Sequence, residues 1–328
     1  MKIQLTIIGL GQIGASAGLA LAKHKESILR VGHDKSRDAV NLAKENQAVD
    51  KIALTLSGAV AEADIVLLAL PLQEIPEVLE HISQDLKDGA LVIDTSPIKT
   101  PVLGWVKEFL PDTTHYVGIT PVINADYLDE CGFGPEVAHE DLFKGNLMGV
   151  VTSRTASNKA INMAANLSEL LGALPYFSDA GEIDGLMSMI HLMPQVLAAS
   201  LLKTSFDAPG WREARKVAGK PYYQLVNPFG QDELPGALTF SLAHNQENTI
   251  RLINDLIRAL VEIRDLVDTA DQEELEGTFT KLQQGRDLWL ADREDGKWNE
   301  TPEIQTRQRG ILAQMLGFRG QKPAREDE

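Results

Sequence analysis

A glycine-rich turn at the start of the chain constrains its fold more than any other feature. The pattern from Ile3 to Ile8 predicts a buried strand, and the spacing G-x-G-x-x-G begins at the next residue, Gly9. A helical pattern follows from Gln12 to about His24, and Ile28 to Gly32 predicts a second strand. Glycines in a strand–turn–helix–strand unit allow a tight turn and a close approach of phosphate groups to the backbone. The segment is therefore predicted to bind a dinucleotide.

The residue after the second strand indicates which dinucleotide. Asp34 follows Gly14 by twenty residues, where a carboxylate accepts hydrogen bonds from ribose hydroxyls and repels a 2′-phosphate. This favours NAD, while the nearby Lys35 and Arg37 keep NADP possible. The alternative is a glycine turn with no ligand and an ordinary loop carboxylate. The predicted cofactor-binding residues, some of them on the later loops described next, are Gly9, Gly11, Gln12, Ile13, Gly14, Asp34, Leu70, Pro71 and Ser96.

Strand and helix patterns alternate over the first half of the chain, which favours a doubly wound parallel sheet. Ligands of such sheets bind beyond the carboxyl ends of the strands, so the loops at 69–72 and 94–99 are expected to face the nicotinamide side. The further strand patterns are Ile65–Leu70, Leu91–Ile93, Tyr116–Gly118, Leu147–Val151 and Leu174–Phe177.

The strand signal fades near residue 180, and helical patterns replace it. A helix over Ile183–Leu202 is interrupted by Pro194, which removes a helical hydrogen bond and should kink it. Asp271 and Glu274 have capping-box spacing before a later helix. The prediction is an α/β fold, with an N-terminal Rossmann doubly wound parallel sheet over 1–180 and an all-α C-terminal domain over 181–292. Residues 293–328 are expected to be a polar tail.

Composition narrows the classes of partner. The formal net charge of −16 disfavours nucleic acid and anionic membrane surfaces, and a small anionic substrate would need a local positive site. The single cysteine, Cys131, forbids an internal disulfide and fits a reducing, cytoplasmic location. By the sequence pattern, no apolar run is expected to be long enough to span a membrane, and the apolar start is interpreted as a folded strand and helix. No metal-ligand cluster is predicted.

Several segments together resemble the prephenate/arogenate dehydrogenase family, over about residues 1 to 293. IIGLGQIGASAGLALAK is similar to that family's nucleotide turn, and VLLALPLQEIPEVLEHI and LVIDTSPIKTPVL are similar to its next two strand–loop units. EDLFKGNLMGVVTS resembles the end of its Rossmann domain, and MPQVLAASL and ALVEIRDLV resemble helices of its second domain. The resemblance implies an NAD(P)-dependent oxidative decarboxylation of a cyclohexadienyl acid on the path to tyrosine, and a homodimer built on the helical domain.

The resemblance also locates a departure. The family carries a histidine in a G-x-H-P segment, where this chain has GITP with Thr120 at the histidine position. The family's helix carries S-H-L-P-H, and both of its histidines are replaced here: His191 lies one residue away from the first, and Gln195 stands at the last position. Threonine cannot take a proton near neutral pH, whereas histidine can. Either another group serves, or the substrate differs, or catalysis is weak or absent. His191 is the candidate substitute, and a histidine merely packed on its helix is the alternative.

Other family positions carry over more directly. Ser96 and Lys99 match D-x-S-x-K, so the resemblance implies that Ser96 bonds substrate or nicotinamide and that Lys99 supports a carboxylate, while Asp94 braces the loop. Arg215 stands where the family places an arginine for the substrate carboxylate, and a solvated helix face is the alternative. The predicted catalytic residues are Ser96, Lys99, Thr120, His191, Gln195 and Arg215.

Two other functions stay open at this stage. A relative acting on another small acid, such as a β-hydroxyacid, would use Lys203 as its catalytic lysine, although Asp207 replaces the asparagine expected four residues later. A non-catalytic NAD(H)-responsive binding module would account for the missing histidines.

Overall fold

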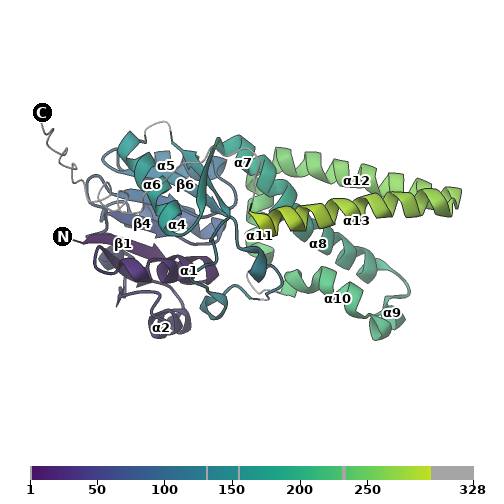
Figure 1. Cartoon of the computed structure of the whole chain (residues 1–328), viewed down its shortest axis with the longest axis horizontal. Helices are drawn as coiled ribbons and strands as arrows, with labels where there is room; N and C mark the ends of the chain where they lie inside the picture. Colours follow the sequence, from purple (N-terminus) through teal and green to yellow (C-terminus); the bar gives the residue numbers. More distant parts are fainter. Residues whose placement is uncertain (1, 131, 154–155, 231–233, 297–328) are drawn as a thin grey trace, which may run out of the picture.

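The computed structural model describes residues 2–130, 132–153, 156–230 and 234–296, so Cys131 and most of the predicted tail lie outside the described residues. Figure 1 shows a sheet flanked by helices at one end and a group of helices that projects from the other end. The predicted α/β class, with a sheet-containing part followed by helices, is confirmed.

One eight-stranded sheet forms the first part, in the order β3-β2-β1-β4-β5-β6-β7-β8. Its first strands pair in parallel, as the predicted crossovers require. The strands are β1 (Ile3–Ile8), β2 (Ile28–His33), β3 (Lys51–Ile52), β4 (Ile65–Leu68), β5 (Leu91–Asp94), β6 (His115–Pro121), β7 (Leu147–Thr152) and β8 (Leu174–Ser178).

The sheet departs from the predicted all-parallel arrangement at one pair. β7 runs antiparallel to β6, and β8 is again parallel to β7. The reason lies in the connection, because the described residues between β6 and β7 form only the short 3-10 turns η3 (Ala125–Tyr127) and η4 (Pro135–Val137). Parallel neighbours need a crossover of a dozen or more residues, usually a helix, and α6 supplies one only between β7 and β8.

Alternating side chains of the strands build two separate cores. Leu5 and Ile7 of β1 belong to the core under α1 (Gln12–Ala20), α2 (Arg37–Glu45) and α6 (Asn158–Leu170). Ile8 belongs to the core under α3 (Leu56–Val60), α4 (Ile75–Ile82) and α5 (Thr100–Phe109), on the other face. Successive side chains of a strand point to opposite faces, so this apolar segment is buried on both sides and its carboxyl end is held rigidly.

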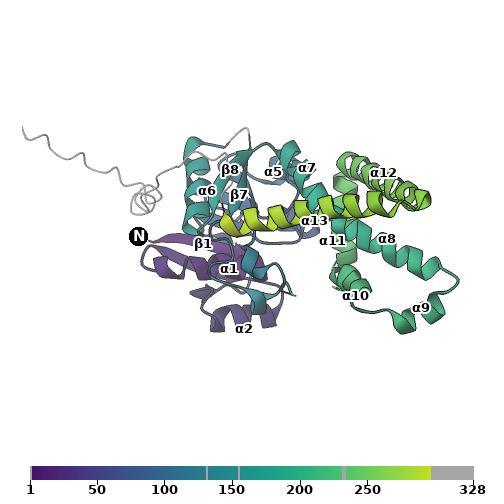
Figure 2. The same cartoon turned by 45° about the vertical axis from the view of Figure 1, so that its right-hand side comes forward.

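The C-terminal part is helical. Figures 1 and 2 show α12 and α13 side by side, projecting from the sheet-containing part and joined at their far ends. Asp271 caps α13 by accepting from the Glu273 and Glu274 amides. The helix runs past the predicted start of the tail, and the Arg293 Nη2 donates to the Ile123 carbonyl beyond β6 at 2.5 Å. The helices are α7 (Ala180–Met187), α8 (Met193–Asp207), α9 (Trp211–Val217), α10 (Lys220–Val226), α11 (Leu234–His244), α12 (Gln246–Thr269) and α13 (Gln272–Asp295).

A single π-helical segment, η5 (Ser188–Leu192), joins α7 to α8. It comes just before Pro194, whose missing N–H interrupts the regular α-helical bonding there. Within the described residues, the stretch 180–207 is long and apolar enough, by length and composition alone, to cross a membrane. The sequence-based statement that no such run exists was therefore wrong. Apolar helix faces that pack on other helices pass the same test.

Candidate active site

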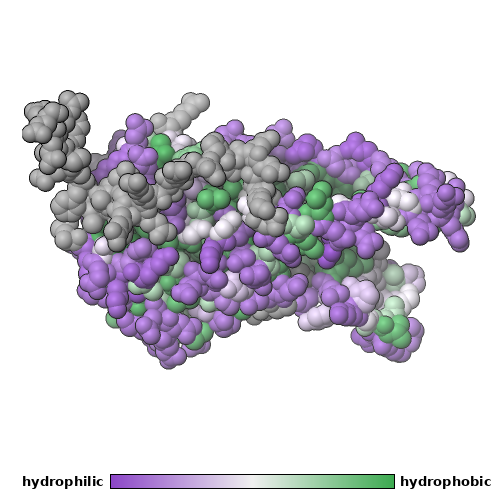
Figure 3. All heavy atoms as spheres, in the orientation of Figure 1, coloured by the Kyte–Doolittle hydropathy of each residue, from purple (hydrophilic) through white to green (hydrophobic). Residues whose placement is uncertain are grey.

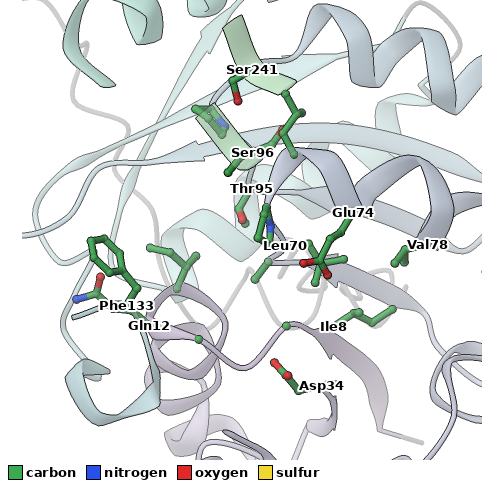
Figure 4. A pocket seen from close by; sticks show the side chains of 18 of the residues that line it. Ile8, Gln12, Asp34, Leu70, Glu74, Val78, Thr95, Ser96, Phe133 and Ser241 are labelled. Carbon is green, nitrogen blue, oxygen red and sulfur yellow. The ribbon is translucent and has the colours of Figure 1, made fainter. Parts of the chain in front are cut away.

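A cavity of about 640 Å³ lies at the carboxyl edge of the sheet, between the strands and the helices that follow them. Its walls include the glycine turn, the ends of β2, β4 and β5, and residues of η5, α8 and α11. Figure 4 shows Asp34 on one side of this space and Ser96 and Ser241 on the other. Of the predicted site residues, it is lined by Gly9, Gly11, Gln12, Ile13, Asp34, Leu70, Pro71, Ser96, His191 and Gln195.

The glycine turn has the geometry that a phosphate cradle requires. Gly9 has a φ of +92°, and a Cβ there would lie 2.2 Å from the Ala69 carbonyl oxygen. A Cβ on Gly14 would lie 1.9 Å from the Gly9 carbonyl oxygen. Gly14 does not line the cavity, so its role here is to let α1 pack on the turn. Only glycine fits at these two positions, which brings the start of α1 close to the end of β4.

Asp34 is bonded to the turn as well as exposed to the cavity. Its Oδ2 accepts from the Leu10 amide at 2.7 Å, and its Oδ1 accepts from the Ser36 amide at 2.7 Å. Each carboxylate oxygen has a second lone pair, so both remain able to accept from a ribose hydroxyl. The glycine turn, the backbone N–H groups at the start of α1 and the Asp34 carboxylate together fit a dinucleotide.

Lys99 lies outside the cavity, in a fully buried network behind Ser96. Its Nζ donates to Asp94 Oδ2 at 2.9 Å and to the Ile119 carbonyl at 2.7 Å. Burial lowers the pKa of the Lys99 ammonium, and the Asp94 carboxylate opposes that shift. Asp94 also accepts from the Ser96 amide at 2.8 Å and from the hydroxyls of Ser96 and Tyr116. Lys99 and Asp94 brace the loop that presents Ser96, and neither side chain lines the cavity.

Asp184 joins this loop to the helical part, and it is not among the site residues predicted from the sequence. Its carboxylate accepts from the Lys99 amide at 2.5 Å and from the Thr100 amide at 3.0 Å, at the start of α5. Asn245 Nδ2 donates to the Asp184 carbonyl at 3.2 Å and to Ser188 Oγ at 2.5 Å. This buried chain of bonds fixes η5, and thereby His191, relative to the Ser96 loop. An acidic residue inside the apolar stretch IDGLM was the available signal.

His191 and Gln195 reach the cavity from η5 and α8. The side chain of His191 is exposed at the cavity wall, and partial desolvation by the packed residues around it lowers its pKa, so the neutral imidazole predominates at pH 7. Gln195 Nε2 donates to the His191 carbonyl at 2.9 Å, which links the two residues across one helical turn. A neutral imidazole and an amide therefore face the same space as Ser96.

A family model places this arrangement among known proteins. The model described as "Prephenate dehydrogenase, nucleotide-binding domain" matches residues 17–176, which comprise most of the sheet. The match agrees with the sequence resemblance, and it begins just after the glycine turn. Over these residues the chain is similar to the prephenate/arogenate dehydrogenase family. The prediction of NAD(P) as the cofactor class is thereby confirmed.

Individual relatives match most of the length of this chain. The prephenate dehydrogenase of Bacillus subtilis (strain 168) is 25% identical over 302 residues, which are 88% of this chain and 76% of that protein. The prephenate dehydrogenase of Lactococcus lactis subsp. cremoris (strain MG1363) is 27% identical over 282 residues, covering 84% and 74%. The structure of prephenate dehydrogenase from A. aeolicus in complex with hydroxyphenyl propionate and NAD+ has a TM-score of 0.74 at 18% identity, covering 87% and 98%. That structural similarity shows a shared fold.

Thr120, which stands where the resembled family carries a histidine, does not line the cavity. It lies in β6 with 5% of its surface exposed, and its Oγ1 has no hydrogen-bond partner among the described residues. A hydroxyl in this place cannot serve as a base near neutral pH. Two histidines line the cavity, His33 at the end of β2 and His191 on the helical side that faces Ser96.

The two remaining candidates lie away from the cavity. Arg215 is exposed on α9, which Figure 1 shows far from the sheet, so the structure does not bring it to the other site residues. Lys203 is exposed on α8 and pairs with Asp207 at 2.8 Å, in an ordinary i,i+4 ion pair. Neither side chain reaches Ser96 or His191 in this structure.

Sequence reasoning missed parts of the cavity wall that come from distant segments. Phe133 follows β6, and Ala237, Leu238 and Ser241 lie on α11. No motif marks them, because each becomes part of the site only through the packing of the loop and of α11 against the sheet edge.

Proposed function

We propose that the chain is an NAD(P)-dependent dehydrogenase of a cyclohexadienyl acid, prephenate or arogenate, whose reaction couples hydride removal to decarboxylation. The observation that carries the proposal is the single cavity lined by the glycine turn, Asp34, Ser96 and a neutral His191. The turn and Asp34 would hold the dinucleotide, which supplies the hydride acceptor when bound. NAD is the proposed form, because an Asp34 carboxylate repels a 2′-phosphate.

The substrate end of the cavity offers three neutral groups. The Ser96 hydroxyl is fixed by its bonds to Asp94 and to the Ile98 carbonyl at 3.0 Å, and Gln195 and Ser241 stand on the helical side. We propose that the Gln195 amide and the Ser241 hydroxyl donate hydrogen bonds to the substrate's carboxylates. The Ser96 oxygen, whose hydrogen is directed at Asp94, is proposed to accept from the nicotinamide amide or from a substrate hydroxyl. His191 is proposed to accept the proton of the ring hydroxyl as that carbon is oxidised, in place of the family's histidine at the Thr120 position. Its lowered pKa keeps the accepting form populated at neutral pH.

The test is turnover by the purified full-length chain. Prephenate and arogenate are each added to protein with NAD+ or NADP+, and reduced cofactor is followed by absorbance. We expect reduction of NAD+ with one of the two substrates, together with an aromatic product lacking the ring carboxylate. Cofactor binding without turnover of either substrate would overturn the dehydrogenase proposal and favour a non-catalytic NAD(H)-binding module. Failure to bind either cofactor would exclude both the dehydrogenase and the non-catalytic NAD(H)-binding module.

We also propose that the chain is a homodimer through its helical part and acts in the cytoplasm. Support for the dimer comes from exposed apolar side chains along the projecting pair α12 and α13. Figure 3 shows hydrophobic surface among hydrophilic residues on this part of the molecule. Exposed apolar area of this kind marks interfaces. The residues are Ile250, Ile257, Leu260, Val261, Val267, Phe279, Leu282, Leu288 and Trp289.

A further inference from the structure

The first amide of α1 already has a hydrogen-bond acceptor from the chain itself. The Gln12 backbone N–H donates to the Phe133 carbonyl at 2.7 Å. The same oxygen lies 2.9 Å from where a Cβ on Gly11 would be. Both Gln12 and Phe133 line the cavity, and Figure 4 shows them side by side at one end of it. The carbonyl of a distant loop thus sits on the phosphate cradle.

The segment that supplies this carbonyl, Phe133 to His139, is tied to α1 at two more points. Gln12 Nε2 donates to the Val137 carbonyl at 3.1 Å, and the His139 amide donates to Ser16 Oγ at 3.0 Å. Behind it, the rings of Tyr127 and His139 stack with centroids 3.9 Å apart. The carbonyl is therefore held in place by contacts along the whole segment.

A carbonyl oxygen and a phosphate oxygen are alternative acceptors for the same donor. The first amides of an α-helix have no partner within the helix, and a dinucleotide's pyrophosphate binds at this end of the first helix of a Rossmann unit. The Gln12 backbone amide has a single hydrogen to donate, and the Phe133 carbonyl already accepts it at an ordinary hydrogen-bond length. The two acceptors exclude each other unless the segment moves.

We propose that the Phe133–His139 segment occludes the pyrophosphate position of the cofactor-free protein, so that dinucleotide binding must first break the Gln12–Phe133 hydrogen bond. The inference rests on the proposed function only in taking the ligand to be a dinucleotide. The apparent dissociation constant then exceeds the intrinsic one by the inverse of the open fraction. Loosening the segment should tighten binding of any ligand with a pyrophosphate, and should leave a ligand without phosphate unaffected.

The test compares three ligands by calorimetry on the full chain: adenosine, ADP-ribose and NAD+. Ser16→Ala removes the acceptor of the His139 amide without changing a cavity residue. His139→Ala, outside the buried helix, removes the stack on Tyr127 and the contact with Glu130. Ser168→Ala is the matched control, since Ser168 is equally buried in a helix and bonds only the Ala164 carbonyl of its own helix.

We expect Ser16→Ala and His139→Ala to bind NAD+ and ADP-ribose about three- to tenfold more tightly, the range that losing one hydrogen bond of the closed form gives. Adenosine affinity should stay the same, and the control should match wild type. Hydrogen exchange at the Gln12 amide, without ligand, should be faster in both variants. Unchanged or weaker ADP-ribose binding in both would overturn the occlusion while leaving the proposed function intact. If wild type binds neither adenosine nor NAD+, the proposed function falls together with this inference.

Discussion

The surroundings of His191 determine which protonation state its imidazole holds. The ring faces the cavity from η5, and desolvation disfavours its charged form, which lowers its pKa below the usual value of 6.5. The base form is therefore populated throughout the neutral range and is lost only as the pH falls through the lowered pKa. A histidine with a lowered pKa is better suited to accept a proton than to donate one.

Replacing His191→Asn tests this role. We expect kcat/KM to fall about 10²- to 10⁴-fold, the range for general acid–base help, with the dissociation constant of NAD+ unchanged. In wild type, kcat/KM should decline on the acid side with an apparent pKa below 6.5, and the variant should lack that limb. His81→Asn, on the outer side of α4, is the control. A pH profile that is the same in wild type and the variant would exclude His191 as the base.

Asp34 sets the cofactor preference in our proposal, so Asp34→Asn should change it. A hydrogen bond to a charged group contributes about 1.5–3 kcal/mol, so NAD+ binding should weaken by about tenfold or more. Binding of NADP+ should weaken less or improve, because the repulsion of its 2′-phosphate is removed. The ratio of the two dissociation constants, measured by calorimetry, is the readout. An unchanged ratio would show that Asp34 only holds the Leu10 and Ser36 amides.

At the scale of one element, the π-helical turn η5 combines a local irregularity with a functional position. Pro194 cannot donate a backbone hydrogen bond, and the helix before it widens over Ser188–Leu192, the turn that carries His191. Ser188 Oγ donates to the Asp184 carbonyl at 2.6 Å and accepts from Asn245, which ties the widened turn to α12. The irregular turn thus presents His191 to the cavity while its backbone stays bonded.

We predict that Pro194→Ala separates stability from activity. Alanine restores the missing N–H and has the best helix propensity, so the urea midpoint should be unchanged or higher. A regular α-helix would rotate His191 relative to Ser96, so kcat/KM should fall by at least about tenfold, as small misplacements of catalytic groups do. NAD+ affinity is the internal control. A variant with full activity would show that the π-turn is dispensable.

On the scale of the whole molecule, the net charge and the exposed apolar side chains have opposite effects on association. The sequence carries a net charge of −16, which opposes association with anionic surfaces. The projecting pair α12 and α13 nevertheless exposes apolar side chains, among them Ile257 and Leu260, each 52% exposed. A second copy of the chain, covering this face, would bury them.

Multi-angle light scattering at micromolar concentration should give twice the chain mass of 35.9 kDa. The double variant Ile257→Asp/Leu260→Asp should shift the mass to that of the monomer, because two charges would be buried without partners. Glu262→Gln, on an exposed position of the same helix, should stay dimeric. A wild-type monomer would refute the dimer, and a double variant that remains a dimer would move the interface elsewhere.

The sequence alone determined the first half of the fold and the cofactor end of the site. The turn from Gly9 to Gly14 is predictable because only glycine fits its backbone, and buried parallel strands leave uninterrupted apolar runs such as Ile65–Leu68. Asp34 could be placed because the spacing between the glycine turn and the end of the second strand is fixed by one helix and one strand.

Only the tertiary structure decided which distant side chains meet. Lys99 and Arg215 are plausible cationic ligands by sequence, yet one is buried against Asp94 and the other lies exposed on α9. Phe133 carries no motif, and its carbonyl reaches Gln12 only because the loop after β6 folds back over α1. Local patterns record which residues a backbone or a core can accept, whereas contacts across the chain depend on how loops and helices pack, which no short segment encodes.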